Sequence, residues 1–168
     1  VVYGFLQHFQ KEQLCGVIHD YKDFELTEMA YPLFNDGPVP FKIIAFDRII
    51  HRVNPIAPRY LENEESVNEV AKVLIENLLE HRESGVSGTT KFFNDAAEGL
   101  IGGLIWKLKT EYPQLCTLPH LIAIYQLLDT ESLIGFLKTN TTSRAMADAF
   151  ISGKDSDRQT AGVKSTLA

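Results

Sequence analysis

The sequence contains few of the residues that build covalent or metal-stabilised sites. Only 2 of its 168 residues are cysteines, and Cys15 and Cys116 lie far apart, without a Cys-x-x-Cys pair or a Cys/His ligand spacing. This argues against a disulfide framework and against a zinc site, and it fits a reducing compartment. The five histidines are also scattered, with no pair at the i, i+4 spacing of a zinc protease. We therefore expect no metal site in this chain.

Long apolar runs and an excess of positive charge are both missing. No run approaches the ~20 residues that a membrane-spanning helix needs, and the first residues do not form a basic leader followed by an apolar stretch. We therefore expect a soluble, cytoplasmic segment. The 16 basic and 22 acidic side chains give a net charge of -6, which argues against a broad nucleic-acid footprint on this chain.

Phosphate-binding and acyl-transfer motifs are absent as well. A P-loop needs glycines whose amides cradle phosphates, followed by Lys and then Ser or Thr. The dipeptide Gly153-Lys154 lacks the upstream glycine and is followed by Asp155. No serine lies in a Gly-x-Ser-x-Gly elbow. We therefore expect this chain alone to hold no cofactor and no catalytic residue of these motifs.

The first 60 residues have the pattern of a small α/β unit. Residues 14–18 and 41–46 are short apolar runs of the kind that form buried strands, and residues 25–34 predict a helix between them. Residues 1–10 have the spacing of the end of another helix. The order helix, strand, helix, strand favours a parallel βαβ arrangement.

Polar residues follow both predicted strands. Asp20 and Lys22 come soon after the first strand, and ligands of open α/β sheets gather at the carboxyl ends of strands, so these two residues are candidates for a nucleotide-proximal position. The alternative is that Asp20 caps the next helix while Lys22 lies in solvent. A second polar cluster consists of His51, Arg52 and Asn54, and shaping a loop is its better explanation.

The remaining residues predict an all-helical domain that begins near residue 60. Apolar positions recur at helical spacing in five segments, residues 64–80, 92–110, 121–128, 130–137 and 143–151. In the second segment Gly99, Gly102 and Gly103 each cost up to about 1 kcal/mol of helix propensity, so we expect another helix to approach this face closely. The predicted fold class is therefore mainly α with a small α/β part.

Glutamates gather on one side of the helix predicted over residues 64–80. Glu65, Glu69 and Glu76 lie mostly on its polar side, away from the apolar stripe. A negative strip of this kind suits a basic segment of a partner protein, and we predict a partner-docking role for these three residues. The alternative is a helix face that only keeps the domain soluble.

These features occur in the order found in a known protein family. The chain resembles the TraG/TraD-type conjugative coupling proteins, the ATPases of type IV secretion, in four motifs: Asp20-Tyr21-Lys22, Asn54-Pro55, Phe92-Phe93 and Thr117-Leu118-Pro119. The resemblance runs through nearly the whole chain. One departure is Asp23, which stands where the family usually has a glycine.

The resemblance implies an assignment for each part of the chain. Residues 1–60 would be a partial RecA-like motor segment with a truncated parallel sheet and no P-loop. Residues 61–168 would be the all-alpha domain, truncated at its C-terminal end, which serves cargo and relaxosome recognition. ATP and Mg are implied for the parent protein, with a P-loop before Val1 and an acidic hydrolysis motif after Ala168, so this chain alone would not hydrolyse ATP.

The resemblance also implies a cellular setting. The implied partners of the parent are relaxase and other relaxosome proteins, single-stranded DNA and secretion-channel components. The parent would be a homo-hexameric, DNA-translocating ATPase at the cytoplasmic face of the bacterial inner membrane, active in conjugation and mobilization. Two hypotheses compete: a helical protein–protein interaction adaptor without nucleotide chemistry, and a self-contained helical enzyme that uses Asp20, His19 or His51 as acid or base.

Overall fold

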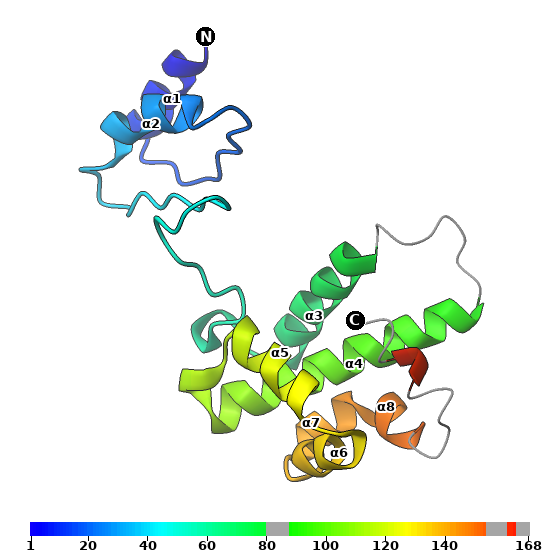
Figure 1. The fold of residues 1–168 in the computed structure, drawn as a ribbon. Helices are drawn as coiled ribbons and strands as arrows, with labels where there is room; N and C mark the ends of the chain where they lie inside the picture. Colours follow the sequence, from blue (N-terminus) through cyan, green and yellow to red (C-terminus); the bar gives the residue numbers. More distant parts are fainter. Residues whose placement is uncertain (80–87, 154–160, 164–168) are drawn as a thin grey trace. The chain divides into compact units, whose positions relative to one another are not determined.

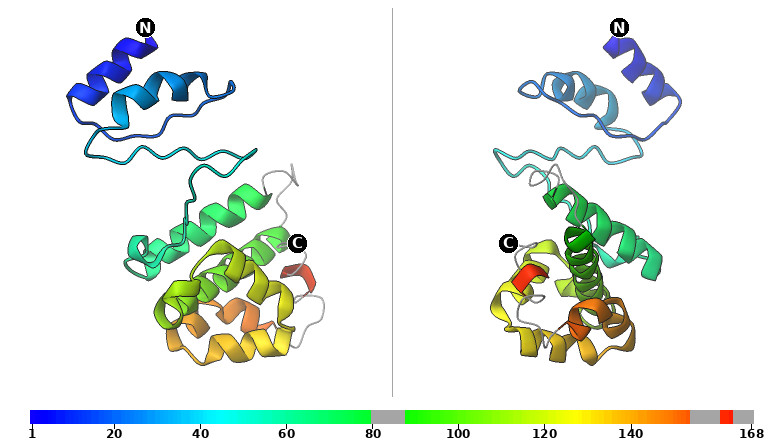
Figure 2. Two further views of the ribbon diagram at one scale, coloured as in Figure 1. Left: turned by 60° about the vertical axis from the view of Figure 1, so that its left-hand side comes forward. Right: turned by 90° about the vertical axis from the view of Figure 1, so that its right-hand side faces the viewer.

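The structure is a computed structural model that describes residues 1–79, 88–153 and 161–163. The chain divides into two units, Val1–Val53 and Asn54–Ala168, which Figures 1 and 2 draw. Over the described residues every regular element is a helix, so the mainly helical fold class is confirmed. The elements are α1 Val2–Lys11, α2 Glu25–Phe34, η1 Pro58–Tyr60, α3 Glu64–Leu79, α4 Gly88–Glu111, η2 Pro113–Leu115, α5 Leu118–Leu127, α6 Thr130–Lys138, α7 Thr141–Met146 and α8 Asp148–Ser152.

The parallel sheet expected in the first unit is not seen. Residues 14–18 and 41–46 form extended chain in place of the two predicted strands, and no strand ladder occurs in the part of the chain that the structure describes. A parallel strand needs hydrogen-bonded neighbours beside it and helices over its faces. Here the side chains of Val17 and Phe46 are 99% and 104% exposed. The apolar surface that would hold a sheet together is therefore uncovered.

Helices α1 and α2 pack against each other in the first unit. Leu6 of α1 and Ala30 of α2 are buried. The second extended segment lies along α2, because the ring of Phe41 stacks on Phe34 with 6.2 Å between centroids and meets Tyr31 edge-on at 5.8 Å. Figure 2 shows this extended chain beside the two helices. The first unit is thus a helical layer with extended chain on one side of it.

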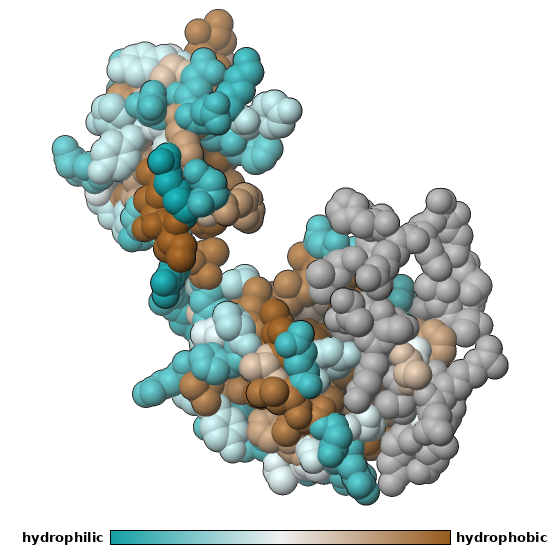
Figure 3. Space-filling view, in the orientation of Figure 1, coloured by the Kyte–Doolittle hydropathy of each residue, from teal (hydrophilic) through white to brown (hydrophobic). Residues whose placement is uncertain are grey.

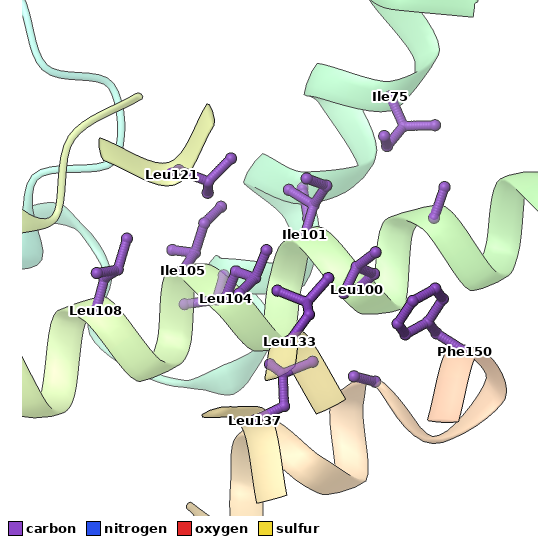
Figure 4. Close-up of a cluster of buried hydrophobic side chains, with 14 of the residues drawn as sticks. Ile75, Leu100, Ile101, Leu104, Ile105, Leu108, Leu121, Leu133, Leu137 and Phe150 are labelled. Carbon is purple, nitrogen blue, oxygen red and sulfur yellow. The ribbon is translucent and has the colours of Figure 1, made fainter. Parts of the chain in front are cut away.

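The second unit is built around α4. Helices α3, α7 and α8 pack along α4, and α5 and α6 cover the rest of its apolar surface. The core of the unit consists largely of aliphatic side chains from α4 and its neighbours (Figure 4). The members that α4 contributes are Ala96, Ala97, Leu100, Ile101, Leu104, Ile105 and Leu108. Because buried residues surround most of the helix circumference, α4 is the central helix of this unit.

The glycines of α4 allow α7 to approach closely, as the sequence predicted. A Cβ atom built on Gly99 would lie 2.5 Å from the carbonyl oxygen of Met146, and one built on Gly103 would lie 2.8 Å from that of Ser143. Any larger side chain would therefore push α7 away from α4. The same glycine spacing occurs in membrane-helix dimers. In the described ranges, however, no helix has both the length and the apolar character that crossing a bilayer requires.

The residues before α3 belong to the helical unit. Ile56 and Leu61 are fully buried in its core. The side-chain amide of Asn54 donates to the carbonyl oxygen of Cys116 at 2.7 Å, and the Cys116 thiol contacts the carbonyl oxygen of Ile56 at 3.1 Å. Residues 54–60, which the sequence placed with the α/β part, are therefore packed with the helices.

Candidate functional site

Asp20 lies at the end of the first extended segment and binds the start of α2. Its Oδ2 accepts from the amide of Thr27 at 2.9 Å and from the Thr27 hydroxyl at 2.8 Å, and its Oδ1 accepts from the amide of Lys22 at 3.3 Å. Burial raises the pKa of Asp20, but the hydrogen bonds from Thr27 and Lys22 outweigh it and hold the pKa below its ordinary value. Asp20 therefore binds the first turn of α2 from outside the helix, whose N-cap residue is Phe24 and makes no side-chain capping hydrogen bond.

Lys22 does not share a site with the Asp20 carboxylate. Its side chain is exposed and makes no ion pair with an acidic side chain of the described residues. The following backbone is left-handed at Asp23 and Phe24, with φ of 36° and 68°. The guanidinium of Arg48 covers the ring of Phe24 at 4.8 Å from its centroid. The loop is therefore held by its turn geometry and by the contact of Arg48 with Phe24 rather than by an ion pair of Lys22.

The structure divides the second predicted cluster between the two units. The Nδ1 atom of His51 accepts from the amide of Ile43 at 3.0 Å, and the His51 amide donates to the Ile43 carbonyl oxygen at 3.2 Å. Arg52 is exposed. Asn54 lies in the second unit, where it binds Cys116. His51 and Asn54 each shape their own piece of backbone, and no common site joins the three residues within one unit.

The acidic strip is an exposed surface of α3 that continues onto α4. Glu65, Glu69 and Glu76 are all exposed. We call these three residues, together with Asp95 and Glu98 of α4, the acidic face. Glu80, at the end of the predicted helix, lies outside the described residues.

Glu98 shows that the two helices contribute to one electrostatic environment. Burial raises the pKa of Glu98, and Asp95 and Glu76 raise it further, while Lys72 lowers it. Lys72 also pairs with Glu76 at 3.8 Å, with both side chains about 60% exposed. The five carboxylates of the acidic face therefore outnumber the two exposed lysines of these helices, Lys72 and Lys91.

Sequence reasoning missed a buried charge at the end of α4. Lys107 is 1% exposed. Its ammonium forms an ion pair with Glu111 at 2.5 Å, donates to the hydroxyl of Thr139, and lies 5.2 Å from the centre of the Phe136 ring. The hydrogen bonds from Lys107 and Asn140 hold the pKa of Glu111 below its ordinary value.

The Lys107 network joins three helices. Asn140 donates to Oε1 of Glu111 at 3.0 Å, and its own Oδ1 accepts from the amide of Ser143 in the first turn of α7. The hydroxyl of Thr139 donates to the carbonyl oxygen of Phe136 at 2.9 Å. The only signal in the sequence was the i, i+4 spacing of Lys107 and Glu111, which also occurs on many solvated helix faces.

Neither a cluster of metal ligands in the described ranges nor a match to a known protein points to a function. Within the described ranges no three His, Cys, Asp or Glu side chains lie together in a way that could hold a metal ion. No family model, curated protein or solved structure matches the chain.

Proposed function

We propose that this chain is a segment of a conjugative coupling protein and that its helical unit docks a basic segment of the transferred cargo on the acidic face. The observation that carries the proposal is the surface formed by Glu65, Glu69 and Glu76 of α3 with Asp95 and Glu98 of α4. The cargo would be a relaxase or another relaxosome protein bound to single-stranded DNA.

Electrostatics explains how such a surface would select its partner. Single exposed ion pairs contribute only about 0–1 kcal/mol each, so the selectivity would come from several charges acting together. Glu98 and Glu76 raise the free energy of each other's charged forms, and a bound cation would relieve that repulsion. Lys or Arg side chains at helical spacing on a partner would fit the carboxylates along α3.

The first unit supports a motor origin through its uncovered extended chain. In residues 41–46 burial alternates from one residue to the next, with Phe41, Ile43 and Ala45 partly buried and Lys42, Ile44 and Phe46 exposed. This two-residue period is that of a β-strand with one face on a helix. We propose that residues 14–18 and 41–46 become strands of a RecA-like sheet when neighbouring strands of a longer protein lie beside them.

The chemistry of that motor would come from outside this chain. ATP, Mg and the hexameric state belong to the proposed parent protein, and no residue here is assigned a catalytic role. Asp20, engaged with Thr27, would hold the start of α2 in place. Lys22 is exposed in the same loop. In the proposed parent protein it would lie near a phosphate of the bound nucleotide, as the resemblance of Asp20-Tyr21-Lys22 to the family's motif implies.

Charge reversal tests the docking proposal. The doubly substituted chain with Glu69→Lys and Glu76→Lys should retain less of the relaxase encoded by the same conjugative element in a pull-down, and the retention by the unsubstituted chain should fall as salt is raised. Glu131→Lys together with Asp148→Lys is the matched control, because both residues are exposed and lie outside the acidic face. Equal retention by all three proteins would remove the acidic face from the account.

A helical adaptor without nucleotide chemistry is the second candidate. It is favoured by α5, where Ile122 and Leu127 are 48% and 82% exposed, and Figure 3 shows apolar side chains over the surface where α5 lies. An apolar helix that is only partly covered in a protein is typical of an interaction surface. Nucleotide binding by the intact protein would favour the motor. An intact protein that is stably folded and does not bind ATP would favour the adaptor.

A further inference from the structure

We propose that the Lys107–Glu111 pair is a charge-dependent clamp that holds the turn between α6 and α7 closed on α4. This turn, residues 136–140, is called the α6–α7 corner below. The inference is independent of the proposed function, because it rests only on contacts inside the helical unit.

The corner is what covers the Lys107 ammonium. Its described contacts outside α4 are the ring of Phe136 and the hydroxyl of Thr139, both in the corner. Asn140, also in the corner, binds the other oxygen of the Glu111 carboxylate at 3.0 Å. The shortest way for this ammonium to regain water is therefore displacement of the corner rather than unfolding of α4.

The two members of the pair differ in their access to water. The side chain of Lys107 is 2% exposed, whereas that of Glu111 is 36% exposed. A buried charge without a partner is strongly unfavourable, while a carboxylate at the surface can be hydrated in place. Loss of the Glu111 charge should therefore open the corner, and loss of the Lys107 charge should not.

This asymmetry separates a clamp from an ordinary hydrogen-bonded pair. A pair exposed on both sides would lose a similarly small amount from either substitution. A clamp predicts that Glu111→Gln alone is damaging and that Lys107→Met, whose unbranched apolar side chain carries no charge, leaves the corner closed. It also predicts that Lys107→Met rescues Glu111→Gln, because the double variant has no buried charge.

Native-state hydrogen exchange on the full chain measures the opening. In Glu111→Gln we expect the amides of residues 137–140 to exchange at least about tenfold faster, and to accelerate more than the α3 amides around Ala71. Lys107→Met and the double variant should exchange at the corner as the unsubstituted chain does. The control is Glu76→Gln, which breaks an i, i+4 pair with lysine that is exposed on both sides, and it should leave the corner unchanged.

Three outcomes would overturn the clamp. One is an unchanged exchange rate at the corner in Glu111→Gln. Another is an acceleration that is equal at the corner and in α3, since that would report only a loss of global stability. The third is failure of Lys107→Met to restore slow exchange in the double variant.

Discussion

Asn54 and Cys116 are 62 positions apart in the sequence and are joined by a 2.7 Å hydrogen bond from the Asn54 side-chain amide to the Cys116 carbonyl oxygen. The bond fixes the entry of the chain into the helical unit, because Ile56 and Leu61 become buried directly after it. The polar cluster that the sequence grouped around His51 therefore contains one residue with a structural role in a different unit.

Asn54→Ala should destabilise the helical unit by about 1–3 kcal/mol, because it leaves a backbone carbonyl near the core without its partner. Urea unfolding followed by the fluorescence of Trp106, the one tryptophan of the chain, measures the change. Asn77→Ala is the matched control. The Asn77 amide also donates to a carbonyl oxygen, that of Val73, but on the exposed side of α3. An equal loss in both variants would contradict the anchoring role of Asn54.

Two helix glycines, Gly99 and Gly135, should respond in opposite directions to substitution by alanine. Gly99→Ala should destabilise the helical unit by about 1–3 kcal/mol, since its Cβ would meet the backbone of Met146. Gly135→Ala on α6 should stabilise it by about 0.5–1 kcal/mol, because a Cβ there has nothing within 4 Å and alanine is the better helix former. The midpoints of urea unfolding measure both effects. Stabilisation by both substitutions would show that α7 can move away from α4 at no cost.

Ser143 predicts a stabilising substitution. Its hydroxyl is buried in the described structure and has no hydrogen-bond partner there. Ser143→Ala removes that unsatisfied group and should stabilise the helical unit by about 1 kcal/mol. Ser66→Ala should have the opposite sign, because the Ser66 hydroxyl donates to the carbonyl oxygen of Asn63 at 2.8 Å and so stabilises the start of α3. Thermal unfolding of the two variants distinguishes the signs.

The two cysteines should react at different rates with a thiol reagent. Cys15 is exposed. Burial raises the pKa of the Cys116 thiol to about 11, so at neutral pH it is protonated as well as covered. A colorimetric thiol assay should find one fast thiol in the native chain and two in urea. Two fast thiols in the native chain would mean that the packing of residues 54–61 over Cys116 opens readily.

Glu98 gives the pH dependence of stability an unusual sign. Its pKa is raised in the folded chain, so the folded state holds this proton more tightly than the unfolded state does. The resulting stabilisation is present at low pH and is lost as the pH rises above the ordinary value of about 4.5. Glu98→Gln should therefore be more stable than the unsubstituted chain at pH 7, by about 0.5 kcal/mol. The two unfolding curves should coincide below about pH 4, and a difference that persists there would rule out the charge as its cause.

The helices were predictable because their apolar spacing is strong. Residues 64–80, 92–110 and 130–137 were expected to be helical, and the structure has Glu64–Leu79, Gly88–Glu111 and Thr130–Lys138. The glycines of α4 also predicted a close helix contact, since their loss of propensity required compensation. The segment 143–151 was expected to be one helix, whereas the structure divides it at Ala147 between α7 and α8.

Features that depend on distant residues were not predictable. The apolar runs at 14–18 and 41–46 have strand character, but a sequence run does not reveal whether neighbouring strands lie beside it. The burial of Lys107 was not predicted, because its contacts are with Phe136 and Thr139, about 30 positions away. Asn54 was grouped with His51 by proximity in sequence, although its partner is Cys116. In each case a long-range contact decided the role.

The assignment to a coupling protein is tested most directly by reading the gene on both sides of the segment that encodes this chain. We expect a P-loop shortly before Val1 and, after Ala168, a strand that ends in acidic residues for magnesium and hydrolysis. A start codon directly before Val1, with neither motif downstream, would contradict the assignment and leave the helical adaptor as the account of this protein.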